Sequence, residues 1–325
     1  MGALWVVAEP GPDGRIANIS AEAATLVRDL AVGTGHQSVG IVIGSDPAGA
    51  ATELAGYLPV VWAITEPGAA DHAWSAVAAR HVANLLGTEK PDAIFVGAGP
   101  DGRDLAGAVS ALTGLGILVN ATAVAWTDAG PAVEMSVFGG KLVTTSGFTN
   151  GRGIVTIRPN VTTAVQAATT GQVEERTVDG LASLPQVRVV ERISEAGAAA
   201  PIEEARIIVA GGRGVGGPEG FAIIEQLAEA LGGAVGASRA AVDAGWIPYS
   251  KQIGQTGKIV KPELYLALGI SGAIQHKVGM RTSGAIVAVN RDTDAPIAEF
   301  ADLFVAGDLF EVGAALLERL SARSV

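Results

Sequence analysis

The sequence contains no cysteine in its 325 residues. It therefore has no disulfide, no thiolate nucleophile and no thiolate ligands for an iron–sulfur cluster. Any redox chemistry must come from an organic cofactor or from a second chain. The sequence also lacks the roughly 18 uninterrupted apolar residues of a membrane helix, although 49% of its residues are hydrophobic. We expect no integral membrane segment.

Basic residues are also scarce, because 22 Lys and Arg face 33 Asp and Glu and give a formal net charge of −11. No basic run offsets this charge, so the surface should repel phosphate backbones, and we expect no nucleic-acid partner. The first residues, "MGALWVVAEPG", enter a strand-like run without the basic segment of a secretory signal. The predicted location is cytoplasmic.

The usual motifs of substrate-converting enzymes are missing as well. We find no G-x-S-x-G elbow, no P-loop, no H-E-x-x-H and no carboxylate pair at helical spacing in an acid–base context. The histidines His36, His72 and His81 lack partners at metal-ligand spacing. The sequence therefore predicts no catalytic side chain and no metal site.

Short apolar runs alternate with helical patterns through the first hundred residues. The expected strands are "LWVVAE", "VGIVIG", "VVWAIT" and "AIFVGAG", and Ser20 is expected to cap the helix after the first of them. This alternation is typical of parallel strands joined by helical crossovers. After "DLAGAVSALTG" the strand-like runs follow one another with little room for helices, which predicts a mixed or antiparallel end to the sheet.

An Ala/Gly/Pro-rich tract near residues 186–203 separates two series of elements. We predict an N-terminal mixed-sheet α/β domain over residues 1–190, a linker over 191–204 and a C-terminal domain over 205–325. The second series opens with "ARIIVAGGRGVGGPEGFAIIEQLAEALGG", a strand, a glycine turn and an amphipathic helix. The C-terminal domain is expected to be a doubly wound, Rossmann-like α/β domain.

The glycine turn of the second series satisfies G-x-G-x-x-G with Gly212, Gly214 and Gly217. An ordinary structural turn explains the same glycines equally well. The next strand ends in Ser238 and Arg239 rather than in the acidic residue that binds a ribose of NAD. This ending argues against ordinary NAD binding and leaves an NADP site or a different nucleotide pose.

Polar residues follow several strands of the second series. The loop "QIGQTGKIV" is either a solvated turn or a ligand contact through Thr256 and the backbone near Gly254. "LYLALGISGAIQHKVGM" is expected to start as a buried strand, begin a helix near Ser271 and expose His276. Asn290 and Asp308 come at the ends of the two later strands, where either residue could simply form a turn. The carboxyl ends of parallel strands converge on one crevice. We therefore expect both loops and both strand ends to form one site.

These segments carry a resemblance to a known family. "LYLALGISGAIQHKVGM" followed by "AIVAVN" resembles the electron transfer flavoprotein alpha subunit. "GGRG", "VGASRAAVDAGW", "QIGQTGKIV" and "APIAEFADLFVAGDLFEV" resemble the rest of that subunit's second domain in the same order, over about residues 205–312. Residues 1–190 resemble the first domain in strand order and in "FGGKL…TIRP", with Asn120 where the family's Asp is expected.

The resemblance implies a C-terminal FAD-binding domain that holds one FAD. It also implies a heterodimer in which the N-terminal domain associates with a beta subunit, which is expected to carry AMP or a second FAD. The positions that match the family's FAD contacts are Arg213, Ser238, Arg239, Gly254, Gln255, Thr256, Ser271, Gly272, Ala273, Ile274, Gln275, His276, Asn290, Asp308 and Leu309.

Three of these side chains have an implied place at the flavin ring. The resemblance puts His276 near the pyrimidine edge, Arg239 near the ring face and Thr256 near N5. An imidazole at the pyrimidine edge would stabilise negative charge there, either as a cation or through a hydrogen bond. A permanently charged guanidinium would raise the flavin potential.

The implied function is electron transfer. Acyl-CoA or other flavoprotein dehydrogenases would be the donors, and a quinone oxidoreductase or a similar protein the acceptor. Two alternatives stay open at this point: a subunit of an electron-bifurcating complex that uses NADH, which would make the protein part of an enzyme, and an NADP-dependent oxidoreductase with Arg239 at the 2′-phosphate.

Overall fold

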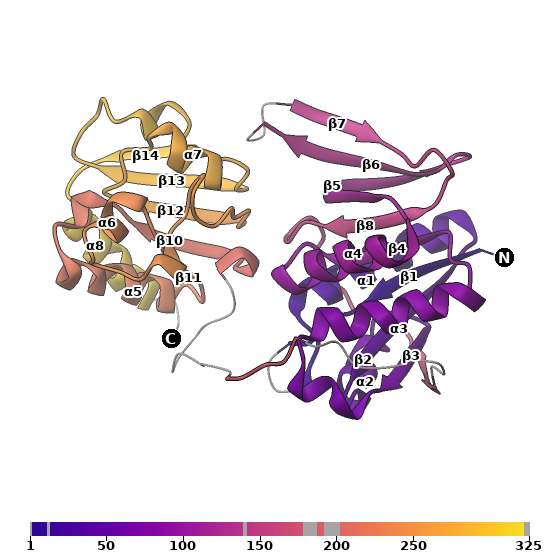
Figure 1. Cartoon of the computed structure of the whole chain (residues 1–325). Helices are drawn as coiled ribbons and strands as arrows, with labels where there is room; N and C mark the ends of the chain where they lie inside the picture. Colours follow the sequence, from indigo (N-terminus) through magenta and orange to yellow (C-terminus); the bar gives the residue numbers. More distant parts are fainter. Residues whose placement is uncertain (1, 12–13, 139–141, 178–186, 192–201, 322–325) are drawn as a thin grey trace. The chain divides into compact units, whose positions relative to one another are not determined.

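A computed structural model describes residues 2–11, 14–138, 142–177, 187–191 and 202–321. The chain divides into two compact units, Met1–Ile193 and Ser194–Val325, drawn in indigo to magenta and in orange to yellow in Figure 1. Residues 192–201 of the predicted linker lie outside the described part. Among the described residues, no helix is long and apolar enough to cross a membrane.

The first unit is built on a nine-stranded sheet with the order β7-β6-β5-β8-β4-β1-β2-β3-β9. Its strands are β1 (Ala3–Val7), β2 (Gln37–Gly44), β3 (Val60–Thr65), β4 (Ala93–Gly97), β5 (Ile117–Thr127), β6 (Gly130–Val137), β7 (Leu142–Ser146), β8 (Gly153–Ile157) and β9 (Gln172–Arg176). β6 runs antiparallel to both β5 and β7, and the other pairs are parallel. The prediction of a mixed sheet is confirmed.

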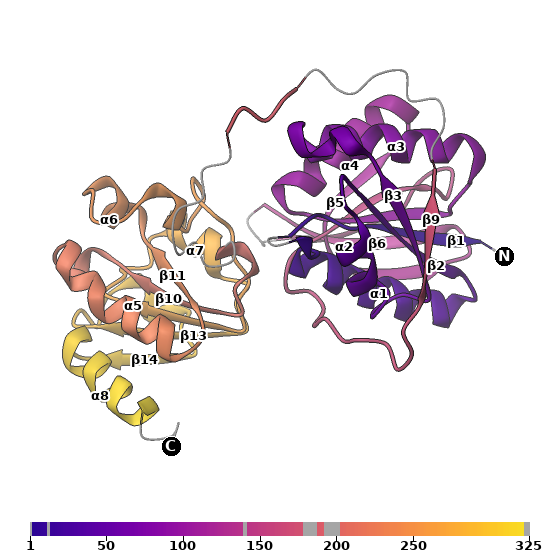
Figure 2. The same ribbon diagram turned by 90° about the horizontal axis from the view of Figure 1, so that it is seen from below.

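Helices cover both faces of this sheet because successive side chains of each strand point to opposite faces. In β1, Leu4 and Val6 enter the core beneath α1 (Asn18–Thr34) and α2 (Ala48–Leu54). Trp5 and Val7 enter the core beneath the other two helices (Figure 2). Those helices are α3 (Trp74–Thr88) and α4 (Pro100–Thr113), and a 3₁₀ turn (Pro67–Asp71) precedes α3.

The start of α1 differs from the prediction. The helix begins at Asn18 with Ala17 at the N-cap, so Ser20 lies inside its first turn. Ser20 is fully buried and its Oγ accepts a hydrogen bond of 2.8 Å from the backbone N–H of Glu9. The predicted cap at Ser20 is wrong because this hydroxyl satisfies a buried amide of the loop after β1 rather than an amide of its own helix.

The second unit has a five-stranded parallel sheet with the order β11-β10-β12-β13-β14. The strands are β10 (Ile207–Gly211), β11 (Ala234–Ala237), β12 (Leu264–Leu268), β13 (Ala285–Asn290) and β14 (Leu303–Ala306). The helices are α5 (Phe221–Ala230), α6 (Arg239–Asp243), α7 (Ile274–Met280) and α8 (Leu309–Ser321), with 3₁₀ turns at Ile202–Glu204, Arg213–Val215, Pro218–Gly220, Tyr249–Lys251 and Pro296–Glu299. The prediction of a doubly wound domain is confirmed.

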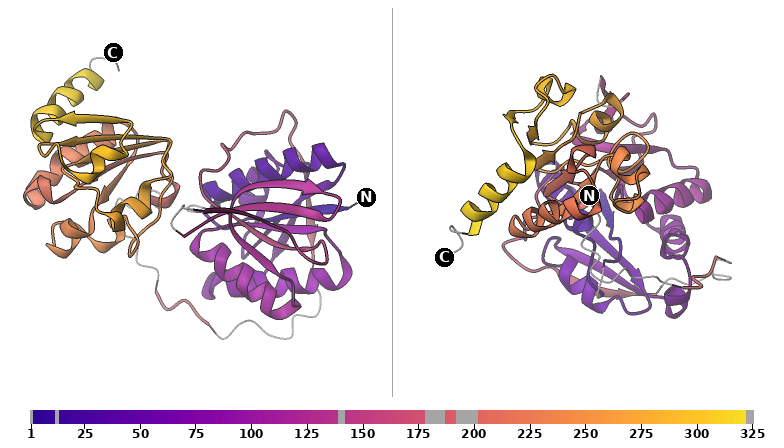
Figure 3. Two further views of the ribbon diagram at one scale, coloured as in Figure 1. Left: turned by 90° about the horizontal axis from the view of Figure 1, so that it is seen from above. Right: turned by 90° about the vertical axis from the view of Figure 1, so that its left-hand side faces the viewer.

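This strand order fixes where a ligand crevice can form. One core packs α5 and α8 on one face of the sheet (Figure 3), and another packs α7 on the opposite face. The chain passes from β10 outward to β11, then returns and continues from β12 in the other direction. The topological switch point is therefore between β10 and β12, and open α/β sheets bind ligands outside the carboxyl ends of the strands at such a point.

Candidate functional site

The glycine turn after β10 packs directly on the loop after β12. The backbone N–H of Gly212 donates to the carbonyl of Leu268 at 2.9 Å, and that of Gly214 donates to Gly269 at 3.0 Å. A Cβ added at Gly214 would lie 2.8 Å from the Cα of Gly269. The two glycines are therefore needed because the two loops approach each other closely. Their backbone N–H groups already donate hydrogen bonds within the protein, which argues against this turn as a pyrophosphate-binding site. Arg213 is exposed on the same turn.

The end of β11 places Ser238 and Arg239 beside the carboxyl end of β10. The Ser238 N–H donates to the Gly211 carbonyl at 3.0 Å, which ties this end to β10. The Ser238 Oγ is buried and has no hydrogen-bond partner among the described residues. Arg239 is exposed and its Nε lies 3.1 Å from the Oδ2 of Asp243, an exposed pair that contributes little to stability.

The loop of residues 252–258 is held at both of its sides. The Ile253 N–H donates to Ala237 at 2.9 Å, and the Gln255 N–H donates to Gln275 at 2.7 Å. Gly254 has a φ of +146°, and a Cβ there would lie 2.9 Å from the Gln275 carbonyl oxygen. Gln252 donates to the Thr256 Oγ1 at 3.2 Å. The loop is therefore a fixed bridge from β11 to α7 rather than a free solvated turn.

The segment after β12 turns sharply before its helix begins. Gly269 and Gly272 have φ values of +64° and +78°. The Ser271 carbonyl accepts a bond of 3.0 Å from the Ile297 N–H. The helix α7 begins at Ile274 and not near Ser271 as predicted. Ser271, Ala273, Ile274 and Gln275 are exposed, and Gly272 is buried.

His276 is buried, with 6% of its surface exposed, so the expectation that it is exposed is wrong. Its Nδ1 lies 3.0 Å from the Ile253 carbonyl, and its Nε2 lies 2.9 Å from the Tyr265 hydroxyl. A carbonyl can only accept, so the proton is assigned to Nδ1, and Nε2 accepts from Tyr265. Burial lowers the pKa of His276 to about 4 and raises the pKa of the Tyr265 phenol well above its ordinary value. The imidazole is neutral at pH 7.

The side chains of Asn290 and Asp308 both form hydrogen bonds with nearby backbone groups. Asn290 donates to the Ile270 carbonyl at 3.0 Å and accepts from the Asp292 N–H at 3.0 Å. The Asp308 Oδ1 accepts from the N–H groups of the first turn of α8, at 2.7 and 3.1 Å, and its Oδ2 pairs with Arg291. Asp308 therefore caps α8. Asn290, Asp308 and Leu309 line a hollow of about 220 Å³ that also includes Gly214 and Gly269.

Comparison with known proteins shows the family to which this chain belongs. The family model "Electron transfer flavoprotein FAD-binding domain" matches residues 201–281, and the model "Electron transfer flavoprotein domain" matches residues 4–181. The chain belongs to the electron transfer flavoprotein alpha-subunit family. The alpha subunit of Thermoanaerobacterium thermosaccharolyticum is 38% identical over 322 residues, which cover 98% of this chain and 97% of the relative. That of Mycobacterium leprae is 38% identical and covers 96% of each chain, and that of Bacillus subtilis is 36% identical and covers 100% and 99%.

The residues that match the FAD-binding domain of this family, 201–281, lie within the second unit. Direct backbone bonds bring together the end of β11, the loop of residues 252–258 and the start of α7, three of the segments predicted from the sequence. The buried Ser238 Oγ fits a bound cofactor, because a buried hydroxyl without a partner costs about 1–3 kcal/mol that a ligand hydrogen bond would recover.

Sequence reasoning missed Tyr265 and the Ile253 carbonyl, which together determine the state of His276. The available signal was a tyrosine within the apolar strand "LYLAL". A phenol hydroxyl buried in a core requires a hydrogen-bond partner. The sequence offered no means of choosing which polar side chain that partner would be.

Proposed function

We propose that this alpha subunit holds one FAD at the carboxyl ends of β10, β11 and β12 and, with a beta subunit, carries electrons between proteins. Acyl-CoA or other flavoprotein dehydrogenases would deliver the electrons, and a quinone oxidoreductase or a similar protein would accept them. The observation that carries the proposal is the junction of Ser238, Gly254–Thr256 and Gln275 within the matched FAD-binding domain. When bound, FAD supplies one- and two-electron chemistry that no side chain of this chain provides.

Several side chains would contribute to binding the cofactor. The Ser238 hydroxyl and the exposed polar groups of Thr256 and Gln275 would contact the cofactor through hydrogen bonds. The exposed guanidinium groups of Arg213 and Arg239 would attract its negative charge. None of these roles requires a proton-transfer step on a substrate.

His276 would position the loop of residues 252–258 rather than supply a positive charge. Its two ring nitrogens connect Tyr265 in β12 with Ile253 in that loop. Both partners are buried, so the imidazole fixes the distance between α7, β12 and the backbone of Gly254. Because the pKa of His276 is about 4, the cationic role that the sequence left open is disfavoured at neutral pH.

The beta subunit would cover the apolar edge of the first unit's sheet. Phe138, Leu142 and Val143, at the adjoining ends of β6 and β7, have exposed fractions of 76%, 55% and 64%. β7 is also one of the two edge strands of the sheet. An exposed apolar edge strand favours association with another chain. We propose this edge as part of the subunit interface.

The test is electron transfer by the reconstituted complex. The chain is purified with its beta subunit and FAD, then mixed in a stopped-flow instrument with a reduced flavoprotein dehydrogenase. The proposal predicts rapid bleaching of the flavin absorbance near 450 nm, followed by recovery when an acceptor is added. A complex with bound FAD that no dehydrogenase reduces would contradict it. NADH-driven reduction of two acceptors would favour the bifurcating alternative, and NADPH binding by the chain would favour the NADP-dependent one.

A further inference from the structure

Gln252 begins the loop of residues 252–258, and its backbone is held by three neighbouring segments. Its N–H donates to the Tyr249 carbonyl at 2.9 Å, and its carbonyl accepts from the Lys258 N–H at 2.7 Å. It also forms a parallel bridge with Ala237, the last residue of β11. Only 3% of its surface is exposed. The side chain of Gln252 is therefore buried and starts from a fixed backbone position at the carboxyl end of β11.

Thr256 is exposed on the same loop, and two other side chains hold it from different directions. The Tyr249 hydroxyl donates to the Thr256 backbone carbonyl at 2.6 Å. The Gln252 Nε2 donates to the Thr256 Oγ1 at 3.2 Å. Tyr249 thus fixes the position of the Thr256 backbone, whereas Gln252 acts on the Thr256 hydroxyl itself.

The direction of the hydrogen bond from Gln252 determines what the Thr256 hydroxyl can do. A hydroxyl has one O–H donor and two acceptor lone pairs, and its hydrogen rotates among staggered positions. The Gln252 amide is assigned with its nitrogen toward Thr256, so Oγ1 accepts and its own hydrogen is directed away from Gln252. Among the residues that the structure describes, no acceptor receives this hydrogen. Thr256 therefore presents an O–H donor to a ligand at the loop.

The residues that match the FAD-binding domain, 201–281, include this loop. We propose that Gln252 is a positioning residue for the cofactor: by occupying a lone pair of the Thr256 hydroxyl, it turns the hydroxyl hydrogen toward an acceptor atom of FAD. The inference rests on the proposed function, in which Thr256 contacts the cofactor. A donor that is already aimed at the acceptor needs no reorientation when the cofactor binds or when charge develops on it. Gln252 acts through Thr256 and needs no contact of its own with FAD.

A double-mutant cycle on FAD affinity tests the proposal, with the full chain in complex with its beta subunit and FAD binding followed by fluorescence titration. Thr256→Val removes the hydroxyl at nearly constant shape and should weaken FAD binding by about tenfold. Gln252→Met removes the donor at similar length and leaves the hydroxyl hydrogen spread over about three staggered positions, so it should weaken binding by about threefold. Added to Thr256→Val, Gln252→Met should cause no further loss, because the hydroxyl through which it acts is gone.

The reduction potential of the bound flavin is a second readout, and a change in loop stability alone would not give it the same pattern. Gln252→Met should shift this potential in the same direction as Thr256→Val and by a smaller amount. Thr256→Ser keeps the hydroxyl, so it should bind FAD nearly as well as the wild type. In the Thr256→Ser background, the threefold effect of Gln252→Met should return.

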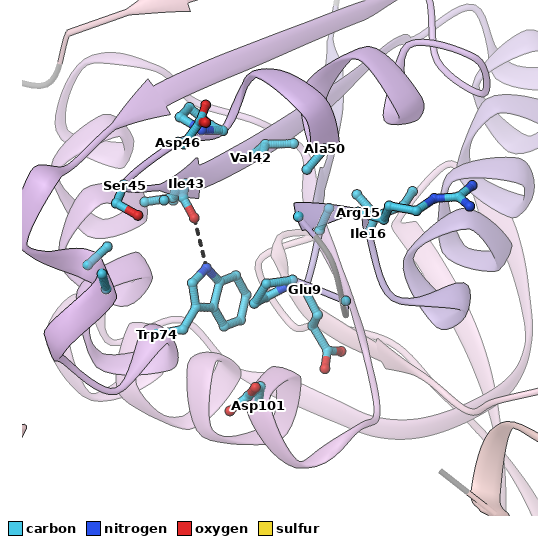
Figure 4. A pocket seen from close by; sticks show the side chains of 18 of the residues that line it. Glu9, Arg15, Ile16, Val42, Ile43, Ser45, Asp46, Ala50, Trp74 and Asp101 are labelled. Atoms are coloured by element: carbon cyan, nitrogen blue, oxygen red, sulfur yellow. Dashed lines mark hydrogen bonds between the residues drawn. The ribbon is translucent and has the colours of Figure 1, made fainter. Parts of the chain in front are cut away.

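Two control variants should bind FAD like the wild type. Gln226→Met changes an exposed glutamine of α5 in the same unit. Trp74→Phe removes a buried N–H donor in the first unit, where the Trp74 Nε1 donates to the Ile43 carbonyl at 2.9 Å beside a hollow of about 480 Å³ (Figure 4).

The proposal is overturned if Gln252→Met binds FAD like the wild type. It is also overturned if the double variant loses about thirtyfold in affinity, the product of the two separate effects, because Gln252 would then act independently of the Thr256 hydroxyl. Either result, obtained with a wild-type complex that binds FAD and transfers electrons, leaves the proposed function standing. A wild-type complex that binds no FAD would overturn both.

Discussion

Acidification should destabilise the second unit through His276. The folded state holds this imidazole neutral with a pKa of about 4, whereas the ordinary value is 6.5. Above pH 6.5 the folded and unfolded states are both neutral at this group. Between pH 6.5 and pH 4 the unfolded state binds a proton that the folded state does not, so stability falls as the pH falls. The loss between pH 7 and pH 5 is about 2 kcal/mol from this group.

Hydrogen exchange of the full chain, resolved by peptide, measures this loss in the second unit alone. The second unit must be measured separately because burial also lowers the pKa of His81 in the first unit. A loss of about 2 kcal/mol corresponds to roughly thirtyfold faster exchange of the most protected amides of β12, after correction for the intrinsic rate. In His276→Gln this pH dependence should disappear. The control His72→Gln should retain it, and the reasoning is refuted if His276→Gln retains it too.

Four further substitutions test the site and the interface. Gly254→Ala places a Cβ at a φ of +146° and 2.9 Å from the Gln275 oxygen, so it should cost about 1–3 kcal/mol in urea denaturation and lower FAD retention. Gly87→Ala, in helix α3 where the space is open, should not destabilise the protein. Ser238→Ala removes a buried hydroxyl that has no partner among the described residues, so it should make the flavin-free unit at least as stable as before while weakening FAD binding by about tenfold, whereas the exposed Ser250→Ala should change neither. Asp308→Ala removes the cap of α8 and should cost about 1 kcal/mol in denaturation, most of which Asp308→Asn should restore. Val143→Lys should weaken beta-subunit association in analytical ultracentrifugation; equal weakening by Val32→Lys, on the exposed face of α1, would argue against the proposed edge.

The fold was largely readable from the sequence because its signals are local. Strands such as β12 are short apolar runs between glycine-rich turns, and the loss of helices after α4 correctly predicted a mixed sheet. The start of α1 was not readable in this way. Ser20 satisfies an amide of the preceding loop, and that amide competes with the helix for the same hydroxyl.

The site was readable as a set of segments but not as a set of contacts. The amides of Gly212 and Gly214 were candidates for a ligand, and they are used by a loop more than fifty residues later in the chain. His276 was grouped with Ser271, Gly272 and Gln275 from the sequence, yet its burial depends on Tyr265 and on Ile253, which reach it only through tertiary packing. A sequence shows which polar groups follow a strand, and only the fold shows which of them are already bonded.

The most direct test of the central claim is an experimental structure of this chain with its beta subunit and added FAD. The account predicts one FAD at the carboxyl ends of β10, β11 and β12, in contact with the Ser238 hydroxyl and the loop of Gly254–Thr256, with His276 still bonded to Ile253. A complex whose only flavin lies away from these loops, or one that binds none, would contradict it.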